Sequence, residues 1–117
     1  MKSSFKKLFV WQKADALALK IYQFSKDFPK TEMYGITSQL RRSGLSIPTN
    51  LAEAAGRQNP KETKQFVNIA LGSITEVEYL LEFSYKLGYL KDKEYQEINE
   101  LRNDTGALLW LFYQSLK

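Results

Sequence analysis

The chain of 117 residues contains no cysteine and no histidine. Without cysteine it cannot form disulfides, thiolate nucleophiles or thiolate metal sites. Without histidine it lacks the commonest metal ligand and the side chain that titrates near neutral pH. Most familiar catalytic arrangements are therefore excluded. Carboxylates with lysine, tyrosine or serine remain for an enzyme, and we expect a protein that is not an enzyme and uses no cofactor or metal.

Long apolar runs are also missing, and no stretch approaches the roughly 20 apolar residues that a helix needs to cross a bilayer. The first residues do not show the charged and then apolar segments of a signal peptide. We therefore expect a cytoplasmic protein that does not enter a membrane. The composition, 44% hydrophobic and 26% charged, fits one globular domain over residues 1–117.

Positive charge is concentrated in the first half of the chain. Residues 1–64 contain 12 lysines and arginines against 5 acidic residues, a balance of +7, whereas residues 65–117 contain 5 against 8, a balance of −3. Such asymmetry suits an anionic partner such as RNA or DNA, and it equally suits subunits whose halves attract one another. Both explanations remain open at this point.

Apolar residues recur with helical spacing in four stretches, and no stretch alternates with the period of two typical of a strand. The expected class is all-α, and the short breaks predict an antiparallel up-down-up-down four-helix bundle. Helices are expected over residues 10–27, 31–55 and 60–87, and from residue 92 toward the end of the chain.

Residues with known capping preferences mark the expected helix ends. Thr31 and Asp92 are candidate N-caps for the second and fourth helices. Gly56 is expected to end the second helix in a left-handed conformation. The start of the third helix is the sharpest boundary, because Asn59 is followed by Pro60 and then by a glutamate at the third helical position.

Pro48 lies inside the expected second helix, where it removes one N–H group and crowds the carbonyl of Gly44. Glycine adds no side chain to that crowding, and Ser43 or Ser46 could donate to the freed carbonyl. We therefore expect one helix kinked at Pro48 rather than two helices. Because proline costs about 3 kcal/mol in an unadapted helix, the kink should serve packing or function.

Two neighbouring stripes run along this second helix. The apolar stripe is expected to face the core and comprises Ile36, Leu40, Gly44, Ile47, Leu51 and Ala54. Beside it, polar side chains fall within an arc of roughly 80°. We interpret these as a polar packing seam that holds the register between helices by hydrogen bonding. The seam residues are Gln39, Ser43, Ser46, Asn50, Glu53 and, from the third helix, Glu76.

An enzymatic alternative would use Glu53 and Glu76 as a carboxylate pair. No histidine, glycine-rich phosphate loop or metal-ligand cluster in the sequence supports it.

Several apolar residues fall outside the core faces that helical spacing predicts. The third helix is expected to turn inward Phe66, Ile69, Ala70, Ser73, Val77, Leu80, Ser84 and Leu87. Apolar residues beside such faces predict a second buried surface, between the subunits of an oligomer. The candidate interface residues are Leu71, Ile74, Tyr85, Tyr89, Trp110 and Leu111.

Guanidinium and ammonium groups near the second helix form the candidate nucleic-acid surface, because they match phosphate oxygens and their charges add across an oligomer. The candidates are Arg41, Arg42, Arg57, Lys61 and Lys64. Arg41 is expected to point away from the seam and so toward a ligand. The alternative for Arg42 and Arg57 is an ion pair with a glutamate of the seam.

Several sequence blocks occur in a characteristic order over about residues 5–90. They are Leu8–Ala14, Phe28-Pro29 with Glu32, Gln39–Arg42, Ser46–Glu53, Gly56-Arg57, and Ile69–Ser73 with Glu76. Together they resemble the bacterial 23S rRNA intervening-sequence protein family. Ala54 departs from that pattern, because the family usually has glycine there.

The resemblance implies a four-helix bundle that assembles into a ring-like homopentamer. Many members of the family are encoded in insertions within 23S rRNA genes, and no enzymatic or ribosomal role is established for them. A related group, the accessory proteins of diversity-generating retroelements, forms basic pentamers that bind nucleic acid. We therefore expect a non-catalytic oligomer that binds RNA or other nucleic acid, and the alternative is a protein-interaction scaffold.

Overall fold

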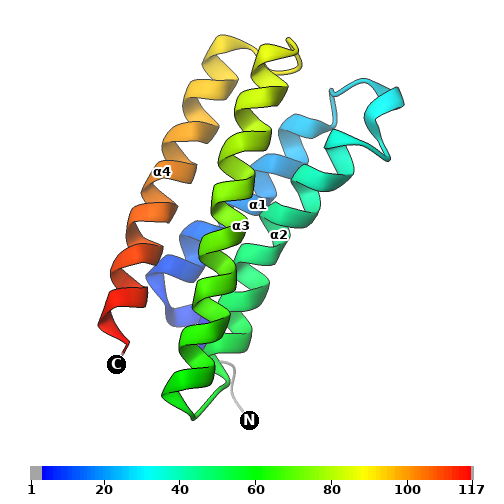
Figure 1. The fold of residues 1–117 in the computed structure, drawn as a ribbon. Helices are drawn as coiled ribbons and strands as arrows, with labels where there is room; N and C mark the ends of the chain where they lie inside the picture. The colour runs from blue at the N-terminus through cyan, green and yellow to red at the C-terminus, as the bar shows by residue number, and fades with distance from the viewer. Residues whose placement is uncertain (1–3, 117) are drawn as a thin grey trace.

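The computed structural model describes residues 4–116. Its elements are the short 3₁₀ helices η1 (Phe5–Lys7) and η2 (Lys30–Glu32), and the helices α1 (Phe9–Ser25), α2 (Ile36–Ala55), α3 (Pro60–Lys86) and α4 (Asp92–Ser115). No strand occurs among the described residues. The predicted all-α class with four long helices is therefore confirmed (Figure 1).

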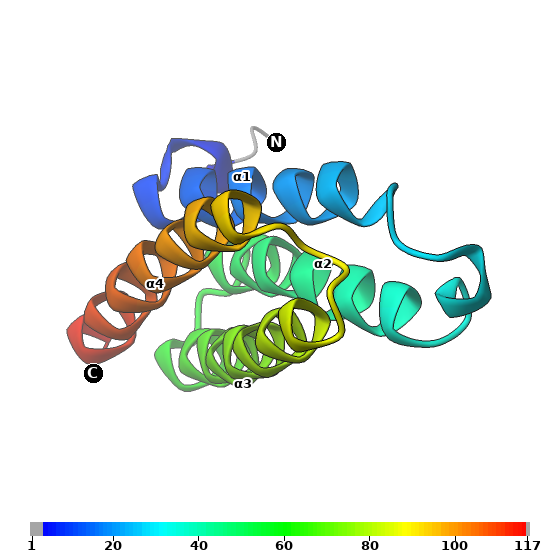
Figure 2. The same cartoon turned by 90° about the horizontal axis from the view of Figure 1, so that it is seen from above.

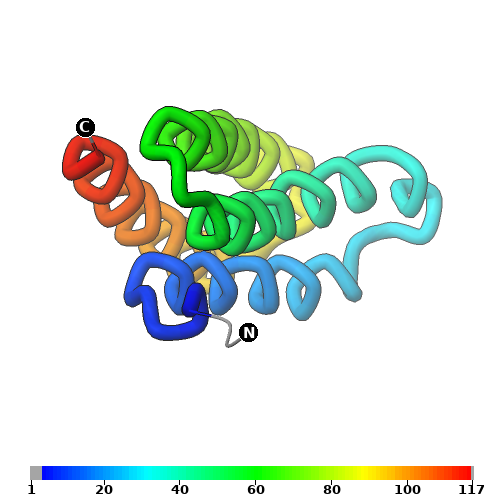
Figure 3. Tube along the Cα trace, turned by 90° about the horizontal axis from the view of Figure 1, so that it is seen from below, coloured from blue at the N-terminus to red at the C-terminus, as the bar shows by residue number. Residues whose placement is uncertain are grey.

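Each long helix packs against two others, so the contacts form a closed ring: α1 with α2, α2 with α3, α3 with α4, and α4 with α1 (Figure 2). Figure 3 shows the opposite end, with the turn that joins α2 to α3 and with η1 beside the start of α1. The bundle measures 43 × 23 × 21 Å. Its long dimension matches α3, whose 27 residues rise roughly 40 Å.

The centre of this ring is an aliphatic core. All six residues of the apolar stripe predicted for α2 are buried, which confirms that stripe as the core face. Ala54 is among them, and its methyl group is accommodated in the core. Within residues 4–116, no helix is both long and apolar enough to cross a membrane.

The core face predicted for α3 is partly wrong. Ile74 was expected beside the core and is buried in it, whereas Ile69 was expected inside and is 50% exposed. Leu87 was also expected inside, but it lies just beyond the end of α3 and is 45% exposed. For the two isoleucines, the reason is that α4 packs against the side of α3 that carries Ile74. Gly106 of α4 leaves room there, since a Cβ atom at Gly106 would lie 3.8 Å from the Cδ1 atom of Ile74.

The start of α2 is also later than predicted. Thr31 does not cap this helix but lies in η2, and α2 begins after Gly35. The intervening loop is held against the far end of α3, because the hydroxyl of Tyr89 donates to the carboxylate of Glu32 at 2.8 Å. This long-range contact holds η2 apart from α2, where local preference alone predicts one continuous helix.

α2 runs through Pro48 without interruption. Four residues before Pro48, Gly44 lets α1 pack closely against α2. A Cβ atom at Gly44 would lie only 2.6 Å from the Cδ1 atom of Ile21 on α1. The predicted serine donors are used elsewhere. Ser43 donates to the carbonyls of Gln39 and Leu40, and Ser46 bonds with a serine of α3. Gly44 therefore serves the close approach of α1 to α2.

The remaining helix ends are a mixture of confirmed and corrected predictions. Asn59 caps α3, and its side chain accepts a hydrogen bond from the backbone N–H of Lys61 at 2.9 Å. Gly56 is right-handed, with φ −86°, so the predicted left-handed end is wrong. The left-handed glycine is Gly88, with φ 82°, after α3. Asp92 is the first residue of α4 rather than its N-cap.

Candidate nucleic-acid interface

The five basic side chains predicted to form one surface lie in two places. Arg41 and Arg42 belong to the first half of α2, whereas Arg57, Lys61 and Lys64 surround the turn between α2 and α3. From Arg42 to its last residue, α2 rises roughly 20 Å. One phosphate group therefore cannot touch both groups, but a strand lying along α2 can.

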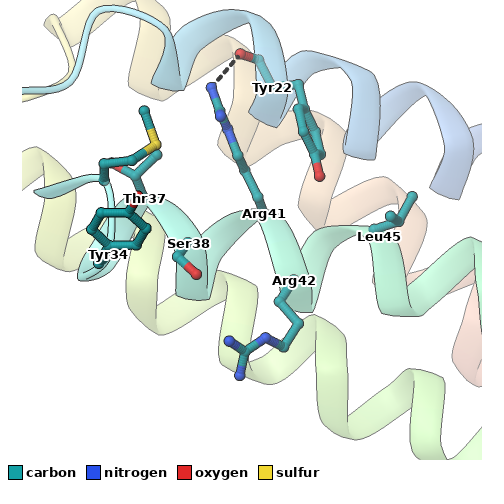
Figure 4. Close-up of a pocket in the computed structure, with 8 residues that line it drawn as sticks. Tyr22, Tyr34, Thr37, Ser38, Arg41, Arg42 and Leu45 are labelled. Carbon is teal, nitrogen blue, oxygen red and sulfur yellow. Dashed lines mark hydrogen bonds between the residues drawn. The ribbon is translucent and has the colours of Figure 1, made fainter. Parts of the chain in front are cut away.

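Arg41 reaches across to α1 instead of pointing freely into solvent (Figure 4). Its Nε donates to the hydroxyl of Ser25 at 2.8 Å, and its Nη2 donates to the carbonyl of Tyr22 at 3.4 Å. Its guanidinium carbon also lies 4.8 Å from the centre of the Tyr22 ring. Arg41 thus fastens α2 to the end of α1, and its guanidinium has a fixed orientation.

Arg42 and Lys61 are exposed, and among the described residues neither side chain takes part in an ion pair or a hydrogen bond. Figure 4 shows Arg42 leaving α2 on the side away from Tyr22. Both cations are therefore accessible to an anionic partner.

Arg57 and Lys64 have partners within the chain. Arg57 pairs with Glu53 one turn earlier, at 2.8 Å, and its guanidinium carbon lies 4.7 Å from the centre of the Phe66 ring. Lys64 lies 5.0 Å from the centre of the Tyr113 ring on α4. The Arg57 pair is exposed, so it is worth little energy and still permits contact with phosphate.

The central residues of the polar packing seam lie between α2 and α3. The hydroxyls of Ser46 and Ser73 are hydrogen-bonded at 2.9 Å, which joins the two helices directly. Asn50 donates from Nδ2 to the carbonyl and the hydroxyl of Ser46, at 2.8 and 2.9 Å. Asn50 and Ser46 are half-buried, and the three side chains form one connected network.

The outer residues predicted for the seam do not join this network. Gln39, Glu53 and Glu76 are exposed, and Glu53 pairs with Arg57 of its own helix. Ser43 is buried but donates only to carbonyls of α2. The hydrogen-bonded part of the seam is therefore shorter than the sequence pattern suggests.

Replacing Asn50 with alanine is expected to lower the free energy of unfolding by about 1–2 kcal/mol, because two partly buried hydrogen bonds are lost. Asn68→Ala provides the control, since Asn68 is an exposed asparagine on α3. Its free energy of unfolding should change by less than about 0.5 kcal/mol. Urea denaturation of both variants measures the difference, and equal effects at the two sites would refute a stabilising role for the seam.

The candidate interface residues also differ in exposure. Trp110 and Leu111 are 50% and 61% exposed on α4, whereas Leu71 is half-buried. Ile74 belongs to the core, as described above, and has no surface to offer a partner. The apolar surface that remains for a partner on α4 is therefore centred on Trp110 and Leu111.

Tyr85 and Tyr89 make contacts inside the chain. The Tyr85 hydroxyl donates to Asp92 at 2.6 Å, and its ring stacks on that of Tyr95 with centres 4.3 Å apart. Hydrogen bonds to Asp92 and to Glu32, respectively, raise the pKa of Tyr85 and of Tyr89 above the usual tyrosine value. These two tyrosines thus hold the α3–α4 turn and the η2 loop in place.

A hollow beside Arg41 was not predicted from the sequence. It is lined in part by Tyr22, Tyr34 and Thr37, which come from α1, the loop before α2, and the first turn of α2. Sequence spacing does not bring these segments together. The available signal was Tyr34 itself, an aromatic residue followed by glycine in a helix break.

The described residues contain no group of three or more acidic side chains placed to hold a metal ion. Glu53 and Glu76 lie on different helices, and Glu53 has Arg57 as its partner.

Residues 6–110 match the family model of the 23S rRNA-intervening sequence protein. The fold is similar to a crystal structure from Bacteroides thetaiotaomicron VPI-5482, a protein with unknown function from the S23 ribosomal protein family. The TM-score is 0.82 and the identity 27%, over 90% of this chain and 95% of that one. No curated protein matches the chain.

Proposed function

We propose that this chain, which belongs to the 23S rRNA-intervening sequence protein family, is a non-catalytic homo-oligomer that binds RNA or another nucleic acid through a basic surface. The proposed assembly is a pentamer, as the family resemblance implies. The bacterial cytoplasm is the proposed location. The surface consists of Arg42, Arg57, Lys61 and Lys64, with Arg41 at its inner edge.

This proposal rests on one observation: most of the basic candidate side chains form no ion pair with an acidic side chain of the described residues. Four ion pairs join side chains of the described residues, and Arg57 is the one member of the five basic candidates that takes part. Unpaired cations at both places along α2 favour binding to a polyanion that lies along this helix, because each phosphate contact releases a condensed counterion. Repetition of the surface around an oligomer multiplies that effect.

We further propose that the bundle is antiparallel, up-down-up-down, and that α2 bends at Pro48. Short connections of four or five residues join α2 to α3 and α3 to α4, and they lie at opposite ends in Figure 1. Trp11 of α1 donates from its indole N–H to the carbonyl of Pro48 at 3.2 Å. A bend at Pro48 would thus serve packing, because this hydrogen bond joins α1 to α2 at the proline.

A scaffold that binds only proteins is the second candidate function. It is favoured by the half-exposed apolar residues Trp110 and Leu111, which suit a protein surface and not a phosphate backbone. In that case the basic residues would organise subunits or an acidic partner protein.

A filter-binding titration with structured RNA, single-stranded RNA and duplex DNA over a salt series separates the two functions. A nucleic-acid binder should retain at least one probe at micromolar protein, with affinity that falls steeply as salt rises. A scaffold should retain none of them at any salt concentration. That second result would refute the proposed function.

A further inference from the structure

A hollow of about 450 Å³ lies between α1 and the first half of α2, beside the loop that follows η2 (Figure 4). Its volume falls within the roughly 300–1,000 Å³ typical of small-molecule sites. The lining contains two arginines and no acidic residue. Two neighbouring hollows along α1 and α2 both include Asp15. Among these three hollows, the charge therefore suits an anion only here.

Arg41 provides a fixed cation at this hollow. A guanidinium group has five N–H donors, and the protein uses one on Nε and one on Nη2, for Ser25 and Tyr22. Three donors remain available. Because its contacts with α1 already hold Arg41 in place, binding an anion costs little further side-chain entropy.

Thr37 adds an unpaired hydroxyl at the same place. The residue is only 2% exposed, and its Oγ1 is a buried side-chain oxygen without a hydrogen-bond partner among the described residues. Thr37 lines the hollow and lies four residues before Arg41, on the same face of α2. A buried unpaired hydroxyl is costly. Because Oγ1 of Thr37 has almost no accessible surface, it reaches a ligand in the hollow only when the side chain turns to its other helical rotamer.

Tyr34 supplies an aromatic surface at the rim. Its side chain is 98% exposed and lies three residues before Thr37 in the chain. Tyr34 shares the lining of this hollow with Arg41 and Arg42. An aromatic ring left in water and cations within one site are the combination with which proteins bind unpaired bases, since the ring stacks on the base and a cation holds the phosphate.

We infer that this hollow binds one unpaired nucleotide of a single-stranded nucleic acid. Arg41 binds its phosphate, and the Thr37 side chain turns so that its hydroxyl donates to the same phosphate. Tyr34 stacks on its base, while Arg42 at the rim contacts the next phosphate. The inference rests on the proposed nucleic-acid function and deepens it, because it assigns a preference for unpaired strands over duplexes.

The test uses fluorescence anisotropy with the full chain, a fluorescein-labelled 12-nucleotide oligouridine and a 12-base-pair RNA duplex. Tyr34→Ala should weaken oligouridine binding by about 10-fold, the effect of losing one stacked base. Duplex binding should stay within about 2-fold, because a paired base does not reach the ring. Tyr34→Phe keeps the aromatic ring and should bind oligouridine as tightly as the wild type does. Tyr79→Ala, at an exposed tyrosine on α3, should change neither affinity.

Thr37→Val provides a second readout. Valine removes the unpaired hydroxyl, so the melting temperature should rise by a few degrees. Oligouridine affinity should fall several-fold at the same time, because the phosphate loses a hydrogen bond. A hydroxyl with no ligand role would give the thermal shift alone.

The outcomes separate this inference from the proposed function. If the wild-type chain binds neither probe, both fail. If it binds oligouridine and both Tyr34→Ala and Thr37→Val bind it equally well, the inference fails while the proposed function stands. Loss of the oligomer in Tyr34→Ala would make Tyr34 a subunit contact and would also overturn the inference.

Discussion

Reversing the charges of Lys61 and Lys64 to glutamate is expected to weaken nucleic-acid binding about 50-fold or more at roughly 100 mM salt. Two lost phosphate contacts make the slope of log K against log salt about 1.8 less steep. Between 1 M and 0.1 M salt, that difference in slope amounts to about 60-fold in affinity. Neither lysine takes part in an ion pair within residues 4–116. The bundle should therefore fold as before, apart from the loss of the Lys64 contact with the Tyr113 ring.

The matched control reverses Lys91 and Lys93, which are exposed beside the start of α4. It changes the net charge of each protomer by the same amount as the Lys61 and Lys64 variant. If binding depends on the turn between α2 and α3, the control should keep its affinity within about 3-fold. Equal losses in the two variants would show that total charge, and not this surface, governs binding.

Leu111→Asp is expected to convert the proposed oligomer into monomers of 13.6 kDa at micromolar concentration. Leu111 is 61% exposed in the protomer, so the substitution should leave the helices and the core intact. In a subunit interface, however, it would bury an unpaired carboxylate, which costs several kcal/mol at every repeat of the contact. Sedimentation equilibrium measures the mass, and circular dichroism checks the fold.

Leu19→Asp is the control for this experiment, because Leu19 is 59% exposed on α1 and so matches Leu111 in residue type and exposure. The control should keep the mass of the wild-type oligomer. If instead it dissociates and Leu111→Asp does not, the interface lies on the α1 side of the bundle, and the assignment to Trp110 and Leu111 is wrong.

Local signals in the sequence were sufficient for most of the fold. The apolar stripe of α2 has a strict helical period, and all its residues are buried. Asn59 followed by Pro60 marks a helix start whose hydrogen bond is made within two residues. Such features depend on neighbours along the chain, so spacing and capping preferences identify them.

The errors occur where contacts between distant segments decide the result. Thr31 has the local character of a cap, but its segment forms η2, which the bond between Tyr89 and Glu32 joins to the turn after α3. Ile74 and Ile69 exchange places because α4 packs on one side of α3. Helical spacing gives a periodic face, but it does not say which neighbouring helix covers each edge.

The candidate site was the least accessible to sequence reasoning. Arg41 was expected to point toward a ligand, and its partners on α1 are 16 and 19 residues away. The hollow beside it combines residues from three elements, and the unpaired state of Thr37 is a property of packing. The central hydrogen bond of the seam, between Ser46 and Ser73, was anticipated only as a polar stripe.

Assembly and nucleic-acid binding can be measured together by sedimentation velocity of the wild-type protein mixed with a fluorescent single-stranded RNA, at low salt and micromolar protein. We expect the RNA to sediment together with an oligomer of about five protomers and to be released as salt is raised. RNA that sediments alone at every salt concentration, beside protein of 13.6 kDa, would contradict both the assembly and its ligand.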